Sequence, residues 1–189
     1  MSEPMGLLRT WFDRAVADGV REPGALAFAT ADARGRCTNR IVQVLEIRET
    51  GLVFASHTGS QKGRDLAETG WGSGVFYWRE AARQVIVTGP AHPLPDEESD
   101  AIWAARPVST HPMSVASHQS EPLLDEDALR EEARRLGEAG TALPRPATWV
   151  GYLLEPASVE FWESDPGRLY LRLRFDREDD GWRTSRLQP

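Results

Sequence analysis

The stretch Ser56–Gly70, SHTGSQKGRDLAETG, combines residue types that bind anions. It follows the short apolar run GLVFA and contains two serines and Lys62, immediately before a segment with helical character. Backbone N–H groups at a helix start, hydroxyl groups and an ammonium group can converge on one anion. We therefore expect an anion-binding loop between a strand and a short helix.

Three arginines supply further positive charge. Arg40 lies in NRIVQV, a segment that is otherwise apolar at alternate positions. Arg168 and Arg172 lie four residues apart in RLYLR and would share one face of an extended strand. Two like charges on one face either share an anion or are solvated, and the residues alone leave both alternatives open.

Other catalytic patterns are absent from the sequence. His57, His92, His111 and His118 lack metal-ligand spacing, so we expect no metal site. The chain has no Gly-x-Ser-x-Gly elbow, Walker loop or Rossmann glycine fingerprint. Its single cysteine, Cys37, is predicted to be a small strand residue, with a reactive thiol as the alternative.

The elements that would position these groups are mostly short strands. Hydrophobic periodicity predicts an amphipathic helix over 5–18, and capping signals predict helices over 95–105 and 125–140, with a polar loop over 106–122 between them. Glycine-containing turns separate short apolar runs, which predicts antiparallel strands over 25–47, 51–56, 74–78 and 83–94, and three closing strands over 151–164, 168–178 and 181–188.

These elements predict a single mainly β (α+β) domain over 1–189. It would be an antiparallel β-barrel with peripheral helices over 22–189, preceded by an N-terminal helical segment over 1–21. Whether that segment covers the pocket or packs on the barrel is open at this point.

Composition excludes several classes of partner. The chain has 189 residues, 40% hydrophobic and 27% charged, and a net charge of −7, which argues against nucleic-acid or anionic-membrane binding. No apolar run approaches the roughly 20 residues that a membrane helix needs. The first residues lack a signal-peptide pattern, so we expect a cytoplasmic protein.

Six stretches in order resemble the pyridoxamine 5′-phosphate oxidase family of FMN-binding split barrels, from about Pro23 to Pro189. They are NRIVQVLEI, GLVFASHTGSQKGRDL, ARQVIVTGPA, ASHQS, VEFWES and RLYLRLRF. Within the family, KGRDLAETGWGSGVFYWRE, SVASHQS and ALPRP are most similar to the oxidases of phenazine biosynthesis. The resemblance implies a homodimer with FMN at the subunit interface.

The resemblance also implies a set of cofactor-binding residues. Those matching the FMN phosphate site are Arg40, Ser56, Ser60 and Lys62. Gln61 stands where the family usually has an arginine, which implies a weaker grip on the phosphate. The remaining matches are Gln84 at the flavin ring, Gln119 and Ser120 in a second FMN-binding loop, and Trp162 and Arg172 at the isoalloxazine. In the family, Gln84 and Trp162 would come from different subunits.

The matched substrate positions differ from those of the vitamin B6 oxidases. Leu45, Ile102, Thr110 and Tyr170 stand where those enzymes have lysine, tyrosine, serine and histidine, and only Arg106 and Arg168 are kept. An apolar pocket with two guanidinium groups suits a flat carboxylated polycycle better than a phosphate. No side chain is required as an acid or base, and Tyr170 and His57 are the candidate proton carriers.

The resemblance therefore implies an FMN-dependent oxidase of phenazine biosynthesis. It would remove two electrons from a partly reduced phenazine carboxylic acid and pass them to O2, giving hydrogen peroxide. Two alternatives stay open: a pyridoxamine or pyridoxine 5′-phosphate oxidase of vitamin B6 metabolism, and a split barrel that binds flavin without turnover.

Overall fold

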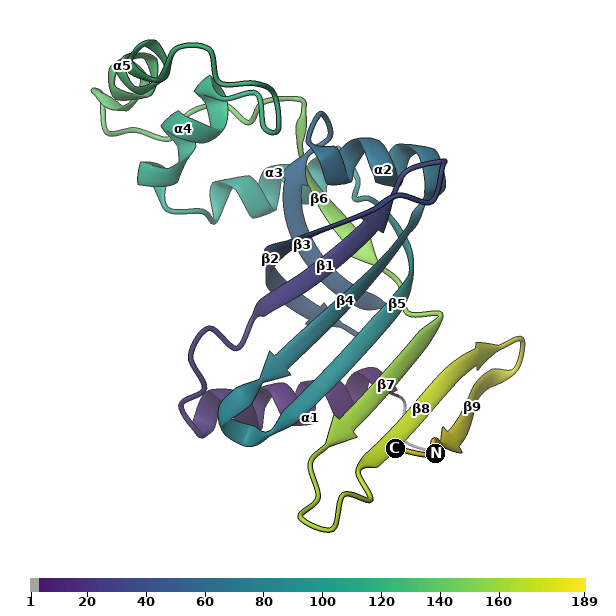
Figure 1. Ribbon diagram of the computed structural model, residues 1–189. Coiled ribbons are helices and arrows are strands. Elements are labelled where there is room, and N and C mark those ends of the chain that lie inside the picture. The colour runs from purple at the N-terminus through teal and green to yellow at the C-terminus, as the bar shows by residue number, and fades with distance from the viewer. Residues whose placement is uncertain (1–3) are drawn as a thin grey trace.

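Alternating side chains make the central strands amphipathic. In β1 (Ala25–Ala31), Leu26, Phe28 and Thr30 are buried and the residues between them are partly exposed. Strands β4 (Trp71–Trp78) and β5 (Arg83–Pro93) alternate in the same way. Because successive strand residues face opposite sides, each strand buries one face in a common core. The computed structural model describes residues 4–189, and in it the strands close into a barrel (Figure 1).

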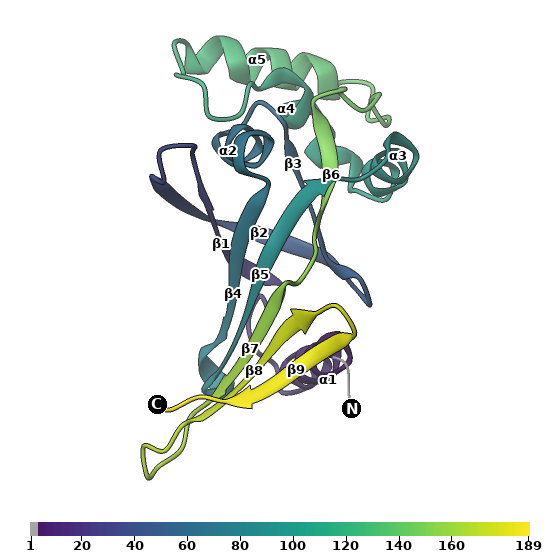
Figure 2. The same cartoon turned by 90° about the vertical axis from the view of Figure 1, so that its right-hand side faces the viewer.

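The barrel is a closed ring of antiparallel strands in the order β4-β1-β2-β3-β6-β5, with β5 pairing back to β4. Three further strands extend the sheet beside β5 in the order β7-β8-β9 (Figure 2). The remaining strands are β2 (Cys37–Arg48), β3 (Gly51–His57), β6 (Trp149–Leu154), β7 (Ser158–Glu163), β8 (Leu171–Glu178) and β9 (Gly181–Arg186). The predicted mainly β barrel is thereby confirmed.

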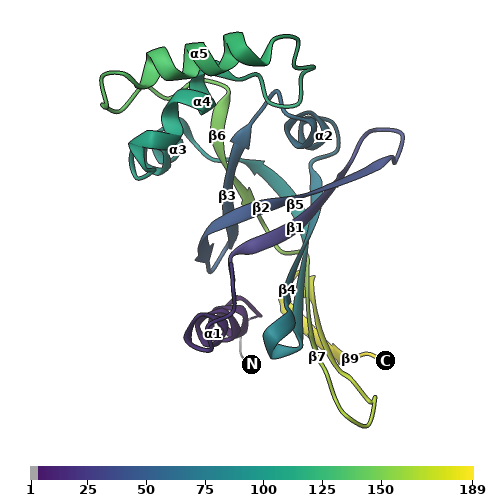
Figure 3. The same cartoon turned by 60° about the vertical axis from the view of Figure 1, so that its left-hand side comes forward.

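Helices lie at both ends of the barrel (Figure 3). At one end are α2 (Gln61–Thr69), α3 (Asp96–Ala104), α4 (His111–Ala116) and α5 (Glu126–Gly137), and at the other is α1 (Pro4–Ala17). Two 3-10 turns, η1 (Arg79–Ala81) and η2 (Val108–Thr110), complete the set. Within residues 4–189, none of the helices combines the length and apolar character needed to cross a membrane.

Helix α1 packs on the barrel core. Met5 and Leu8 are buried in the main hydrophobic cluster, and Trp11 contacts Phe161 edge to face with ring centroids 5.1 Å apart. In the described residues this segment therefore packs on the barrel, and residues 1–3 lie outside the described part of the chain.

The prediction of three closing strands was wrong, because residues 151–164 form parts of two strands. Pro156 lacks a backbone N–H and separates β6 from β7. There the chain crosses β5 so closely that a Cβ on Gly89 would lie 1.9 Å from the Glu155 carbonyl oxygen. The crossing moves the chain from the barrel to the sheet extension that carries β7 and β8.

The polar loop predicted over 106–122 was also wrong in part, because it contains η2 and α4. Ser114 Oγ donates to the Thr110 carbonyl (3.0 Å), and His111 is fully buried at the helix start. A helix as short as α4 depends on tertiary packing, which α5 supplies.

Candidate functional site

The ammonium group of Lys62 is buried at the start of α2 among neutral oxygen atoms. Its Nζ donates to Ser56 Oγ (2.8 Å), Ser60 Oγ (3.3 Å) and Gln119 Oε1 (3.1 Å). Burial, and then the charge of Arg40, lowers the pKa of Lys62 to about 8. Within residues 4–189 no carboxylate pairs with this ammonium group, so a bound anion would stabilise its charge.

The N-terminus of α2 adds to the positive potential. Ser60 Oγ caps the helix by accepting from Gly63 N (3.2 Å), and Gln61 N donates to Ser120 Oγ (3.1 Å). A Cβ on Gly63 would lie 2.3 Å from the Thr58 carbonyl oxygen, so glycine permits this close approach of helix and loop. Anions are stabilised at the positive end of a helix.

Arg40 reaches the same place from β2. Its guanidinium donates to Thr30 Oγ1 (2.7 Å) and Thr38 Oγ1 (2.5 Å). Both threonine hydroxyls in turn donate to the buried Asp65, at 2.6 and 3.0 Å, and Gln61 Nε2 donates to the same carboxylate at 2.8 Å. The threonines therefore orient Arg40, and Gln61 directs its amide to Asp65.

These groups surround one cavity of about 420 Å³, lined among others by Arg40, Gln43, Ser56, Lys62, Gln119 and Ser120. Two cations, hydroxyl groups and a helix start fit one phosphate dianion. The structure thus brings together seven of the predicted cofactor-binding residues: Arg40, Ser56, Ser60, Gln61, Lys62, Gln119 and Ser120.

A second cavity, of about 430 Å³, lies farther along β2 and is mostly apolar. Leu45, Ile102 and Arg106, all predicted substrate residues, line it together with Glu46 and Val53. The β2–β3 register shifts between Val44 and Glu46, which makes Leu45 the extra residue of a β-bulge. As a result, Leu45 and Glu46 are both exposed instead of facing opposite sides.

Arg106 is held by aromatic rings rather than by a carboxylate. Its guanidinium carbon lies 5.1 Å from the Trp103 ring centroid and 4.9 Å from that of Trp149, and both terminal nitrogens donate to Ser114 Oγ (3.3 Å). Burial lowers its pKa. Thr110, the fourth predicted substrate residue of this region, instead donates to the Pro107 carbonyl (2.8 Å) and does not line the cavity.

Gln84, Trp162 and Arg172 lie directly opposite one another on β5, β7 and β8. Tyr170 packs on Trp162 with ring centroids 5.1 Å apart, and Arg172 is paired with Glu160 (2.7 Å). One subunit therefore presents Gln84 and Trp162 side by side. The expectation that these two residues reach the flavin from different subunits stays a prediction.

Arg168 lies outside the strand that was predicted to contain it. Strand β8 begins at Leu171, and Arg168 follows the turn at Asp165–Gly167 with its N–H bonded to the Asp165 carbonyl (2.9 Å) and a φ of 62°. The prediction that Arg168 and Arg172 share a strand face was therefore wrong. A non-glycine residue at positive φ is strained, and such strain often marks functional positions.

One subunit carries two separated half-sites. Ala91 N donates to the Gly70 carbonyl at the end of α2 (2.8 Å), whereas Gln84 lies seven residues earlier in β5, about 23 Å along an extended strand. Figure 2 shows the start of β5 and the β7–β9 strands at the end of the barrel opposite to α2. The Lys62 cavity and the Trp162 row therefore lie toward opposite ends of the barrel in one subunit.

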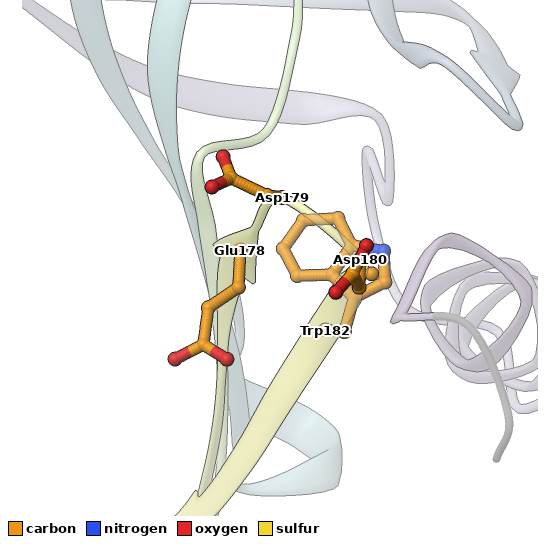
Figure 4. Close-up of a pocket in the computed structure, with 5 residues that line it drawn as sticks. Glu178, Asp179, Asp180 and Trp182 are labelled. Carbon is orange, nitrogen blue, oxygen red and sulfur yellow. The ribbon is translucent and has the colours of Figure 1, made fainter.

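Another cavity, of about 460 Å³, lies at the turn between β8 and β9 (Figure 4). Glu178, Asp179 and Asp180 line it beside Trp182. Three carboxylates repel a phosphate or a carboxylate ligand, so this cavity is not the cofactor or substrate site.

His57, a candidate proton carrier, lies close to both the Lys62 and the Arg106 cations but lines neither of their cavities. Its Nδ1 is 3.3 Å from Thr148 Oγ1. Burial and the charges of Lys62, Arg106 and His118 lower its pKa, so His57 is neutral at pH 7.

Sequence reasoning missed several residues that shape the site. Asp65 follows Gln61 by four positions on one helix, a spacing at which side chains meet, and this signal could have been found. Glu46 and the Trp103–Trp149 pair beside Arg106 had no local signal, because a bulge and a tertiary contact place them.

Sequence profiles identify the family. Residues 12–138 match the profile described as pyridoxamine 5′-phosphate oxidase, and residues 149–189 match the pyridoxine 5′-phosphate oxidase C-terminal dimerisation region. The chain belongs to the pyridoxamine 5′-phosphate oxidase family. The dimerisation region contains β6–β9, and thus Trp162 and Arg172, which indicates that members of this family, including this chain, form homodimers.

Individual relatives lie in two branches of the family. The chain is 49% identical to a dihydrophenazinedicarboxylate synthase from Pseudomonas chlororaphis, covering all of this chain and 85% of that protein. It is 40% identical to a pyridoxine/pyridoxamine 5′-phosphate oxidase from Paraburkholderia phytofirmans, covering 98% and 89% of the two chains.

A solved structure matches the whole fold. It is PhzG from Burkholderia lata in complex with tetrahydrophenazine-1-carboxylic acid, with a TM-score of 0.98 and 48% identity, covering all of this chain and 94% of that one. The chain is therefore similar to an oxidoreductase of phenazine synthesis over its full length.

Proposed function

We propose that this protein is an FMN-dependent oxidase that removes two electrons from a partly reduced phenazine carboxylic acid and passes them to O2, giving hydrogen peroxide. The observation that carries the proposal is the pairing of two neighbouring cavities on β2. One has the charges for a phosphate, and the other has apolar walls and a guanidinium group that pairs with no carboxylate within residues 4–189. The similarity to phenazine synthases supports the same substrate class.

The residues around Lys62 fit the single phosphate of FMN. Lys62 and Arg40 would each donate charge-assisted hydrogen bonds, with Ser56, Ser60 and the α2 N-terminus nearby. Gln119 and Ser120 would close the cavity from the loop before α5. The bound flavin would supply the two-electron redox chemistry, including the transfer to O2.

The flavin site requires two subunits in this proposal. The Lys62 half-site of one protomer would face the Gln84–Trp162–Arg172 row of its partner across the dimer interface. The partner would also supply Arg168 and Tyr170, because both are close in sequence to that row. Neither half-site alone encloses a flavin.

Arg106 would bind and orient the substrate carboxylate. Its planar guanidinium is fixed on Trp103 and Trp149, so little side-chain entropy is lost when it forms two parallel hydrogen bonds to a carboxylate. Leu45 and Ile102 would pack on the flat ring system and exclude water from it. The vitamin B6 alternative is disfavoured because a phosphate dianion beside Leu45 and Ile102 would lose hydration and gain Arg106 as its one cationic partner among the residues that line the cavity.

Turnover and cofactor analysis test this proposal together. Purified protein is expected to carry a yellow chromophore with the mass of FMN, and to form hydrogen peroxide from a reduced phenazine carboxylate in air. A flavin-loaded protein that leaves the reduced phenazine carboxylate unoxidised beyond its spontaneous rate would contradict the proposal and favour a carrier or sensor.

A further inference from the structure

The cavity beside Arg106 contains one cation and one anion in an apolar wall. Leu45, Val53, Ile102, Ala105 and Pro107 are apolar lining residues, and Arg106 and Glu46 are the charged ones. The Glu46 side chain is 54% exposed and Arg48 binds one of its carboxylate oxygens, so the carboxylate can accept a further hydrogen bond from a ligand in the cavity. The cavity therefore favours a ligand with both an anionic group and a hydrogen-bond donor.

A β-bulge in the backbone places Glu46 in the lining of this cavity. In a regular strand Leu45 and Glu46 would face opposite sides, but the bulge between Val44 and Glu46 exposes both. Arg48 then fixes the carboxylate, because its Nε binds Glu46 (2.9 Å) while its Nη1 binds Glu98 on α3 (2.6 Å). Each carboxylate oxygen has two lone-pair sites, so Glu46 retains acceptors for a ligand.

We propose that Glu46 is a specificity-determining residue that selects the reduced form of the substrate by accepting a hydrogen bond from its ring N–H. This inference rests on the proposed function. Reduction of a phenazine nitrogen adds an N–H donor, whereas the oxidised aromatic ring has a bare nitrogen lone pair at that position. An ionised carboxylate only accepts hydrogen bonds, so it attracts the first and repels the second.

Glu46 would thereby help the product to leave. Arg106 and the apolar walls bind reduced and oxidised rings alike, because both are flat and carboxylated. If substrate and product bound with equal affinity, the product would be slow to leave. Repulsion between the Glu46 carboxylate and the lone pair of the oxidised nitrogen lowers the affinity for the product.

Two stable tricyclic probes measure binding selectivity without turnover. Acridone-2-carboxylate has a ring N–H, and acridine-2-carboxylate has a bare ring nitrogen of similar position. Neither requires oxidation to bind. Calorimetric titration of the FMN-loaded dimer at pH 8 is expected to show about tenfold tighter binding of the acridone, the worth of one hydrogen bond to a charged acceptor.

Variants identify the group responsible. Glu46→Gln is expected to bring the two affinities within about twofold, because an amide both donates and accepts. Glu98→Gln is the matched control, since it removes the other carboxylate bound to Arg48 and lies outside the cavity lining. It is expected to keep the preference.

The inference is overturned if the wild-type protein binds neither probe, binds them equally or prefers the acridine, if Glu46→Gln keeps the wild-type preference, or if Glu98→Gln loses it. The proposed function fails separately. A wild-type protein that prefers the acridone yet oxidises no reduced phenazine carboxylate would keep the inference on Glu46 and refute the oxidase.

Discussion

Lys62 and Arg40 face the same cavity from a helix start and a strand, and burial, followed by the charge of Arg40, lowers the pKa of Lys62 to about 8. A cation whose charge is disfavoured by burial and by a neighbouring cation forms a site that an anion stabilises. This relationship has a consequence for the pH dependence of cofactor binding.

We predict that FMN affinity falls above pH 8. In the free protein Lys62 loses its proton as the pH rises through about 8, whereas a bound phosphate dianion favours the protonated amine. The dissociation constant is therefore expected to be about tenfold higher at pH 9 than at pH 7. Flavin fluorescence titrations measure it, and a flat profile in the wild-type protein is the contrary result.

Removal of the lysine ammonium group should weaken FMN binding. Lys62→Ala loses a charge-assisted hydrogen bond worth about 1.5–3 kcal/mol, or about ten- to a hundredfold in affinity. The variant should also lose the pH dependence between pH 7 and 9. Arg64→Ala is the control, because Arg64 lies on the same helix but is exposed and bonds to Gly59 and Gln61. An unchanged FMN affinity in Lys62→Ala would show that the FMN phosphate does not bind in this cavity.

Subunit mixing tests the split site. In a randomly mixed dimer of Lys62→Ala and Trp162→Ala chains, half of the dimers are heterodimers with one intact site, so about a quarter of wild-type activity should return. Mixing Lys62→Ala with Gln84→Ala chains should restore activity equally.

The register of β5 and β7 makes a further distinction. Gln84→Ala and Trp162→Ala alter neighbours on one subunit, so their mixed dimers carry one altered residue in each site and should show no restoration. Restoration in this last pair would place Gln84 and Trp162 at the flavin from different subunits.

Replacing Arg106 should lower the rate of substrate oxidation without changing the affinity for FMN. Arg106→Ala is expected to lower kcat/KM for a reduced phenazine carboxylate by about ten- to a hundredfold, because a charge-assisted pair to the carboxylate is lost. FMN affinity should stay within about twofold, since Arg106 lines the other cavity. A parallel loss of FMN affinity would show that Arg106 supports the flavin half-site instead.

Much of the fold could be predicted because the local patterns agree with the tertiary structure. Short apolar runs between glycine-containing turns predicted strands over 25–47 and 83–94, and two serines and Lys62 before a helical segment predicted the anion loop. Helix α4 was missed because its serine- and proline-rich sequence is helical only through packing against α5.

The candidate site was predictable where one segment contains its residues and unpredictable where strand register decides. Ser56, Ser60 and Lys62 lie in one short segment, whereas Gln84 and Trp162 become neighbours only through the pairing of β5 with β7. Similarly, no local pattern indicates the bulge that turns both Leu45 and Glu46 outward.

The measurement that tests the central claim most directly is kcat/KM for two substrates on one preparation of FMN-loaded dimer. A reduced phenazine carboxylate is expected to be oxidised much faster than pyridoxine 5′-phosphate, because Leu45 and Ile102 suit a flat apolar ring and leave a phosphate dianion with Arg106 as its one cationic partner among the lining residues. Equal or faster turnover of pyridoxine 5′-phosphate would contradict the account and assign the protein to vitamin B6 metabolism.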